Sequence, residues 1–263
     1  MLSSEQVASF NEQGYLRIPQ MFTPEQMDAL DQDLERLVAE WAMTSPGWTG
    51  PWRRVYMDEK TEKASTLTAM HDLYFYSQAW MQGVTEPRLT EAVSDILGSN
   101  VELHHSTLHI KPPSAGHPFP MHQDHPFYMH DDGRYIDVLV HLDDTCHENG
   151  EIRFLAGSHK QGALKHITQL EDGSGCTPHL PTDQYSLEET VAVPAKRGDV
   201  VFFSIHTIHG SHINQTDKAR RMVRVGYRNP QNTQTAGQSH GRPGLMVRGY
   251  RDRQDGQEVL RNT

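Results

Sequence analysis

Cysteine, long apolar stretches and positive charge are all scarce in this sequence. It has two cysteines, Cys146 and Cys176, in 263 residues. That is too few for a disulfide framework or a thiolate metal site, and it is typical of a reducing compartment. No apolar run approaches the roughly 20 residues that a membrane span requires, and the first residues lack the basic-then-apolar pattern of a secretory signal. We therefore expect a soluble, cytoplasmic protein without a membrane partner.

Acidic residues outnumber basic ones by 34 to 24, which gives a formal net charge of −10. Nucleic acids and anionic membranes bind basic surfaces, so neither is expected as the main partner. The composition carries no signal for an oligomeric state.

Helix signals dominate the first hundred residues. Each predicted helix begins at a capping residue or a proline, or ends at a glycine. The predicted segments are a short helix that follows the cap Ser3/Ser4 from Glu5 and is stopped by Gly14, a strand over 15–19, a long amphipathic helix from Pro24 to Trp41, an irregular loop over 44–66, and helices over 68–83 and 86–97.

From Val101 onward the pattern changes to short strands separated by Gly and Pro turns. The predicted strands cover 101–111, 119–122, 135–142, 151–155, 189–194, 199–205 and 221–228, with a long insertion loop over 160–188. So many short strands predict a mainly β fold, a double-stranded β-helix (jelly roll, cupin-like) with the N-terminal α-helices packed on the outside. We expect one domain over 1–263, with a helical N-terminal region over 1–100, a jelly-roll core over 101–229 and a polar tail over 230–263.

The candidate site begins with the tripeptide His122-Gln123-Asp124. An imidazole and a carboxylate two residues apart point to the same side of an extended strand. A second imidazole, from His209 or His206, completes a two-histidine, one-carboxylate set that holds a ferrous ion and leaves positions open for O₂ and a co-substrate. The tripeptide alone is a weak signal, because the chain has 17 histidines. Other histidines near the motif are expected in hydrogen-bonded or solvated loops: His117, His125, His130 and His212.

Further motifs surround both halves of this set. They are Gly14-Tyr15 and Pro24-Glu25, Ile110-Lys111-Pro112-Pro113, Asn149-Gly150, Ala156-Gly157-Ser158-His159-Lys160, Gly198-Asp199-Val200-Val201-Phe202-Phe203, and the string from His209-Gly210-Ser211 through Asn214 and Thr216 to Arg220. Together they resemble the phytanoyl-CoA dioxygenase family of iron(II)/2-oxoglutarate oxygenases. The similarity extends from about residue 3 to residue 229.

The resemblance implies an enzyme that uses iron(II), 2-oxoglutarate and O₂. It implies that His122, Asp124 and His209 are the iron ligands and that Arg220, assisted by Ser211, binds the distal carboxylate of 2-oxoglutarate. A guanidinium suits this task because its planar fork binds a carboxylate bidentately. His209 is preferred over His206 because it lies eleven residues before Arg220 in the His-Gly-Ser context.

In the expected jelly roll, His209 and Arg220 lie on neighbouring strands that face the barrel interior. Related halogenases carry a small residue in place of the carboxylate. Asp124 therefore favours hydroxylation of an unactivated C–H bond of a small-molecule substrate, with 2-oxoglutarate converted to succinate and CO₂. Desaturation and cyclisation stay open as alternative outcomes of the same chemistry.

Several assignments stay open at this level. Lys111 either reaches the co-substrate or is a strand-end lysine whose amine extends to solvent. Some relatives carry a tryptophan against the co-substrate where this chain has Leu139, Val140 and His141. Arg53 and Arg54 recognise an anionic small molecule if the loop over 44–66 folds across the site.

Two aromatic clusters each have two possible interpretations, and the function has two alternatives to the one just given. Tyr74-Phe75-Tyr76 and Phe127-Tyr128 either line a substrate cavity or belong to the core. One alternative function is a cupin-type metal oxygenase that does not use 2-oxoglutarate, which would not need the pairing of His209 with Arg220. The other is a catalytically silent, ligand-binding relative, which would be expected to lack a metal ligand or the arginine.

Overall fold

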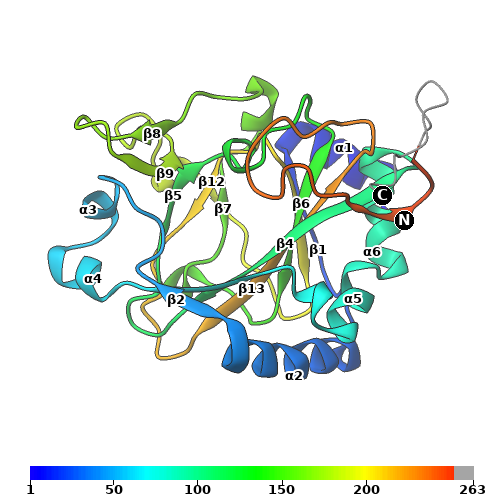
Figure 1. Ribbon diagram of the computed structural model, residues 1–263, viewed down its shortest axis with the longest axis horizontal. Coiled ribbons are helices and arrows are strands. Elements are labelled where there is room, and N and C mark those ends of the chain that lie inside the picture. The colour runs from blue at the N-terminus through cyan, green and yellow to red at the C-terminus, as the bar shows by residue number, and fades with distance from the viewer. Residues whose placement is uncertain (252–263) are drawn as a thin grey trace, which may run out of the picture.

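Two antiparallel β-sheets packed face to face form the centre of the chain, in a computed structural model that describes residues 1–251 (Figure 1). The large sheet has the order β1-β11-β6-β13-β4-β3-β2, with β14 also paired to β4, and the small sheet has the order β10-β7-β12-β5. The large sheet comprises β1 (Tyr15–Ile18), β2 (Met43–Ser45), β3 (Leu67–His71), β4 (Val101–Lys111), β6 (Tyr135–His141), β11 (Val200–Ser204), β13 (Arg220–Arg228) and β14 (Leu245–Arg248). The small sheet comprises β5 (Phe119–His122), β7 (Arg153–Phe154), β10 (Val191–Ala192) and β12 (His209–Ser211).

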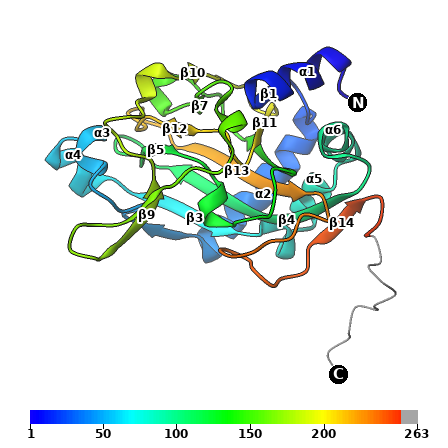
Figure 2. The ribbon, with the colours of Figure 1, turned by 90° about the horizontal axis from the view of Figure 1, so that it is seen from above.

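Helices lie outside the sheets. The α-helices are α1 (Ser4–Gln13), α2 (Pro24–Trp41), α3 (Arg53–Tyr56), α4 (Glu59–Ala64), α5 (Gln78–Val84) and α6 (Pro87–Leu97). Short 3₁₀ turns are η1 (Leu73–Phe75), η2 (His125–Phe127), η3 (His147–Asn149), η4 (Ser158–Gln161) and η5 (Leu187–Glu189). Figure 2 shows α3 and α4 at one end of the sheets and α5 and α6 at the other. Within residues 1–251, no helix has the length and apolar character that a bilayer crossing demands.

The helix ends follow the capping residues in the sequence. The Ser3 side chain caps α1, and Gly14, at a φ of +83°, ends it. The Thr23 side chain accepts a hydrogen bond from Gln26 N, while the Gln26 side chain accepts one from Thr23 N. This reciprocal pair satisfies two backbone donors that would otherwise lack partners at the start of α2.

The alternation of side chains along the strands sorts the large sheet into two different faces. The outer face is apolar and packs against α2, α5 and α6; its members include Leu108, Val138, Val140, Val223 and Val225 on the strands and Leu30, Leu34, Leu89 and Val93 on the helices. The inner face meets the small sheet through Leu139, Phe154, Phe203 and Met222. The predicted jelly roll with external helices is therefore confirmed.

Some local predictions were wrong. The stretch 68–83, predicted as one helix, contains β3, η1 and only the short α5. Met70 is buried on the helix-covered face, while Ala69 and His71 line the cavity on the other. That two-residue alternation suits a strand paired to β4.

The loops also contain regular structure that was not predicted. The stretch 44–66 includes α3 and α4, and the 160–188 insertion folds into a hairpin of β8 (Ile167–Gln169) and β9 (Gly175–His179). The tail contributes β14 to the large sheet. The remainder of the tail, 252–263, lies outside the described residues.

Candidate metal and co-substrate site

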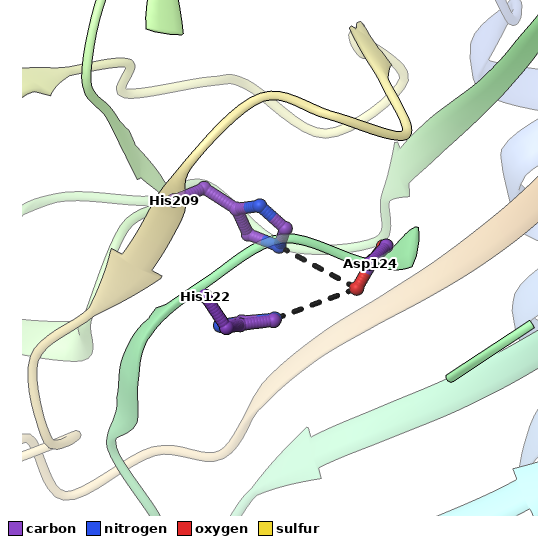
Figure 3. A group of neighbouring side chains, drawn as sticks. All are labelled: His122, Asp124 and His209. Carbon is purple, nitrogen blue, oxygen red and sulfur yellow. Dashed lines mark ion pairs between the residues drawn. The ribbon is translucent and has the colours of Figure 1, made fainter. Parts of the chain in front are cut away.

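Three side chains converge at the adjacent edges of β5 and β12. His122 ends β5 and His209 begins β12, and the two residues are direct partners across the strand pair. Their Nε2 atoms lie 3.4 and 3.8 Å from Asp124 Oδ1 (Figure 3). One ligand atom from each residue lies within 4.8 Å of the other two. This set has the donors and the spacing to hold a divalent transition metal from one side.

The tautomer of each histidine is set by the backbone carbonyl two residues earlier in the chain. His122 Nδ1 lies 2.7 Å from the Pro120 carbonyl oxygen, and His209 Nδ1 lies 3.0 Å from that of Thr207. A carbonyl only accepts, so each Nδ1 carries the proton and each Nε2 keeps a lone pair directed at the shared point. Burial lowers the pKa of His209 to about 3, which keeps that ring neutral.

The backbone conformation that places Asp124 beside the two histidines is not the extended strand that was predicted. The strand ends at His122, and Asp124 has φ −77° and ψ −19°, outside the extended region. Gln123 between them is fully buried, and its amide binds Gly162 O, His206 O and Leu164 N. No role was predicted for Gln123, and its buried amide anchors the turn that brings Asp124 back toward His122.

Arg224 holds the other oxygen of Asp124. Its Nη1 donates to Asp124 Oδ2 over 2.7 Å and also to the Tyr128 hydroxyl. Burial would raise the pKa of Asp124, but the Arg224 guanidinium holds it well below its usual range. Asp124 is therefore ionised, with Oδ1 facing the two imidazoles. Sequence reasoning missed Arg224, although alternation along β13 from Arg220 places it on the same face.

Arg220 lies buried on the inner face of β13 and has no acidic partner within residues 1–251. Its Nη2 donates to the Gly150 carbonyl over 3.0 Å, its Nη1 contacts the Met222 sulfur, and its Nε has no hydrogen-bond partner. Burial lowers its pKa to about 10, so the guanidinium remains charged at neutral pH. A buried cation with an unused donor is a site that an anionic ligand can complete.

Lys111 and Ser211 lie close to this arginine. Lys111 is the direct partner of Arg220 on β4, is fully buried, and donates to Ser211 Oγ over 2.7 Å. Its burial excludes the strand-end reading. Burial, reinforced by the charge of Arg220, lowers the pKa of Lys111 well below its usual value.

Asn214 and Thr216 of the motif string lie in the loop between β12 and β13, where they have a structural role. The Asn214 amide donates to the carbonyls of Lys111, Pro112 and Lys218, and its oxygen accepts from Thr216. These bonds fix the conformation of the loop before β13, and hence the position of Arg220 at the start of that strand. The predicted placement of His209 and Arg220 on neighbouring strands was wrong, because β12 pairs with β5 and β7 whereas β13 pairs with β4 and β6. The two residues come from different sheets.

A cavity of about 230 Å³ opens between the sheets in front of the three ligand candidates. Its apolar lining includes Trp48, Phe119, Phe127, Leu139, Phe203 and Met222. Its polar lining, apart from the metal-ligand candidates, includes Ser45, His71, Thr107, His109, Arg224 and Gln238. This cavity is smaller than the roughly 300–1,000 Å³ of sites for drug-sized ligands.

Other candidates from the sequence lie elsewhere. Arg53 is buried and bound to the carbonyls of Pro46, Trp48 and Glu62, and Arg54 is exposed outside the cavity lining. Of the aromatic clusters, Phe127 lines the cavity, whereas Tyr74 is in the core and Phe75 and Tyr76 are exposed. His206 packs against His125, with ring centroids 5.0 Å apart and the ring planes tilted by 47°, and is not part of the converging group. In the segment where some relatives carry a tryptophan, Leu139 lines the cavity. His141 is buried, and neither of its ring nitrogens has a hydrogen-bond partner within residues 1–251.

Comparison with known proteins gives a consistent result. The family model "Phytanoyl-CoA dioxygenase (PhyH)" matches residues 10–222. An ectoine dioxygenase of Bordetella bronchiseptica is 28% identical over 264 residues, covering 88% of this chain and 77% of the relative. A probable alpha-ketoglutarate-dependent hypophosphite dioxygenase of Stutzerimonas stutzeri is 27% identical over 230 residues, covering 85% and 78%.

Solved structures share the fold. The non-heme alpha-ketoglutarate-dependent carbocyclase SnoK from nogalamycin biosynthesis superposes with a TM-score of 0.73 at 22% identity, covering 95% of this chain and 94% of that one. EctD from S. alaskensis with bound Fe gives 0.67 at 21% identity, covering 90% and 80%. The chain therefore belongs to the phytanoyl-CoA dioxygenase family, and it is an iron(II)- and 2-oxoglutarate-dependent dioxygenase, alpha-ketoglutarate being another name for 2-oxoglutarate.

Proposed function

We propose that this enzyme hydroxylates an unactivated C–H bond of a small molecule in the cytoplasm, with 2-oxoglutarate converted to succinate and CO₂. The observation that carries the proposal is the pairing of a histidine–aspartate–histidine group with a buried arginine that has no acidic partner in residues 1–251. Asp124 supports hydroxylation over halogenation because its carboxylate takes the position that a halide requires. Two unpaired cysteines support a reducing compartment.

His122 Nε2, His209 Nε2 and Asp124 Oδ1 would hold the iron. When bound, iron(II) supplies the activation of O₂ and of the co-substrate. The protein holds both imidazoles neutral and oriented through the Pro120 and Thr207 carbonyls. These bonds orient the ligands before the metal arrives, as outer hydrogen bonds commonly do in metal sites.

Arg220, Ser211 and Lys111 would hold the distal carboxylate of 2-oxoglutarate. Arg220 brings a fixed charge and a free Nε–H, Ser211 a hydroxyl that lines the cavity, and Lys111 an amine within 2.7 Å of that hydroxyl. A bound carboxylate would give the buried guanidinium the counter-charge that it lacks here. A cupin-type oxygenase that does not use 2-oxoglutarate would leave that charge unused.

The aromatic side of the cavity would exclude water and position the substrate. Trp48 packs edge-on against His122 and Phe119, with ring centroids 4.7 and 4.9 Å away. The segment 44–66, considered from the sequence as a loop that folds across the site, thus contributes a tryptophan directly beside the metal-ligand candidates. Dry surroundings strengthen every charge interaction inside the site.

The test compares two histidines three residues apart. We expect His209→Ala to lose iron binding and substrate-dependent succinate formation, while His206→Ala, outside the converging group, keeps both. Iron binding is measured by anaerobic metal titration and succinate by chromatography. Succinate formation that persists in His209→Ala or under a strong chelator would contradict the assignment. Substrate oxidation that needs iron but releases no succinate would favour the cupin-type alternative.

A further inference from the structure

The two oxygens of Asp124 have different surroundings. Oδ1 lies 3.4 Å from His122 Nε2 and 3.8 Å from His209 Nε2, and both dashed lines in Figure 3 meet at this oxygen. Oδ2 instead accepts a hydrogen bond of 2.7 Å from Arg224 Nη1. A carboxylate can bind a metal ion through one oxygen or through both. In this arrangement only Oδ1 faces the point that the two imidazoles share.

Arg224 is itself held in place by side chains other than Asp124. Its Nη1 also donates to the Tyr128 hydroxyl, which in turn donates to Asp137 Oδ2 over 2.6 Å. Its Nη2 donates to His105 Nε2 over 3.2 Å. Tyr128, Asp137 and His105 are all buried. The guanidinium therefore cannot follow a carboxylate that turns without leaving buried polar groups unpaired, which is costly.

A chain of buried hydrogen bonds continues behind His105. Arginine only donates, so His105 Nε2 accepts, and the proton of this ring is on Nδ1, 2.8 Å from His104 Nδ1. His104 Nε2 lies 2.9 Å from the side-chain oxygen of Gln234, which only accepts. His104 therefore donates to Gln234 and accepts from His105. Two imidazoles thus anchor Arg224 to the segment that follows β13.

The number of oxygens that Asp124 gives to iron decides what else can bind there. An octahedral ion that is held by three protein atoms and chelated by 2-oxoglutarate has one position left for O₂. Chelation of the ion by both oxygens of Asp124 would fill that position. It would also require Oδ2 to turn toward the ion and away from Arg224 Nη1, which the buried partners of Arg224 oppose.

We propose that Arg224 is a positioning residue that restricts Asp124 to a single iron-binding oxygen and so keeps one coordination position available beside 2-oxoglutarate. Tyr128 and His105 hold Arg224 in place for this task. A hydrogen bond between two ionised groups is short and strong, which suits it to fix one carboxylate oxygen. The inference rests on the proposed function, since it takes Asp124 as an iron ligand.

Nitric oxide binds ferrous iron and reports whether that position is available. The full chain is loaded anaerobically with saturating iron(II), with and without saturating 2-oxoglutarate. The dissociation constant for nitric oxide is then measured from the electron paramagnetic resonance signal of the iron–nitrosyl adduct. The visible charge-transfer band of the iron–2-oxoglutarate chelate shows that the co-substrate stays bound. The wild type should bind nitric oxide in both states and keep the band.

Arg224→Met should weaken nitric oxide binding about tenfold or more when 2-oxoglutarate is bound, an effect typical of a lost outer partner. Displacement of the charge-transfer band by nitric oxide is the same result, since the two ligands then compete for one position. Without 2-oxoglutarate the variant should match the wild type, because positions remain free even if Asp124 chelates. Unchanged binding beside 2-oxoglutarate would overturn the proposal. Equal weakening in both states would also overturn it, because that indicates general damage to the site.

Arg221→Met is the matched control, because it makes the same substitution on the outer face of β13, where Arg221 pairs with Asp31 and Asp143. Its affinity for nitric oxide should equal that of the wild type in both states. A loss as large as that of Arg224→Met would mean that the strand, and not the bond to Asp124, is responsible.

Two milder variants provide the test if Arg224→Met does not fold. Tyr128→Phe removes one partner of the guanidinium, and Arg224→Lys keeps the charge but loses the planar fork. Each should weaken nitric oxide binding only beside 2-oxoglutarate, and less than Arg224→Met does. Wild-type affinity in both would contradict the inference. A wild-type protein that binds no iron(II) would instead refute the proposed ligands, and with them the proposed function.

Discussion

Three of the four arginines on β13 show how identical side chains on one strand can have different roles. Arg220 and Arg224 point inward, four residues apart, but only Arg224 has a carboxylate partner within residues 1–251. Arg221 points outward and pairs with Asp143 and Asp31. Side-chain alternation separates the outward arginine from the other two. What separates Arg220 from Arg224 is the partner of each guanidinium: the Gly150 carbonyl for Arg220 and the Asp124 carboxylate for Arg224.

Substitution of Arg220 tests the co-substrate site. Arg220→Ala should raise the apparent constant for 2-oxoglutarate about thirty-fold or more, because truncation of one side of a buried charge pair costs roughly 2–5 kcal/mol. Arg220→Lys keeps the charge but loses the planar fork, so a smaller rise is expected. The measurement is a 2-oxoglutarate titration of the iron-loaded enzyme.

Arg221→Ala is the control for this pair of variants. Its ion pairs lie on the outer side of the sheet, so the constant for 2-oxoglutarate should match that of the wild type. A large effect in Arg221→Ala and none in Arg220→Ala would mean that the co-substrate is bound from the other face of β13.

At the scale of elements, the pairing of β5 with β12 determines the distance between the two histidine ligand candidates. His209 lies opposite His122, and Ser211 opposite Phe119. Gly210, between them, has no room for a side chain: a Cβ there would lie 2.9 Å from the Phe119 carbonyl oxygen and 3.0 Å from Leu187. The first of these neighbours is backbone in the partner strand, so it cannot move away without moving β5.

Gly210→Ala should therefore shift β12 against β5 and pull His209 away from His122. We expect iron affinity to fall about tenfold or more, the range seen when ligand orientation is disturbed. Gly175→Ala on β9 is the matched control, because a Cβ there meets no atom within 4 Å and should leave iron binding unchanged. Iron titrations that give the wild-type affinity for Gly210→Ala would show that the strand pair tolerates the added methyl.

At the scale of the whole molecule, the large sheet is apolar outside and polar inside. Its outer face and the helices form the main apolar core, while the inner face carries histidines and arginines around the cavity. Many of the 17 histidines in the chain are buried, and burial lowers the pKa of several of them, His104, His117, His141 and His209 among them. The candidate site thus occupies space that a purely structural jelly roll would fill with apolar side chains, and stability depends on keeping those rings uncharged.

This arrangement predicts sensitivity to acid. Burial lowers the pKa of His104, His117 and His141 to about 3, from an ordinary value of 6.5. The folded values lie below the unfolded one, so the stability is complete above pH 6.5 and is lost as the pH falls toward 3. Each ring accounts for up to about 1.4 kcal/mol per pH unit.

The urea midpoint of the metal-free protein should accordingly fall markedly between pH 7 and pH 5. Equal midpoints at the two values would show that these rings are protonated, and stabilised, in the folded state. Metal-free protein is used so that competition between protons and iron for the ligand histidines does not contribute.

Local sequence signals alone were enough for several features. Ser3, Thr23 and Gly14 mark helix ends through bonds to their own neighbours in the chain, and the predicted strands from Val101 onward are present. The string from His209 to Arg220 pointed to the candidate residues because it is continuous in the sequence. Where a periodic pattern was short, as at 68–83, the prediction was wrong, because pairing with β4 outweighed the local preference.

Contacts between distant strands were decided only in the tertiary structure. The bond from Arg224 to Asp124, the contacts that link Thr107 to Arg224 and to His71, and the placement of His209 and Arg220 on different sheets all depend on how the strands pair. The sequence indicates which face of a strand a side chain occupies, because that depends on adjacent residues. It does not indicate which residue lies opposite, because a shift in register changes every cross-strand neighbour.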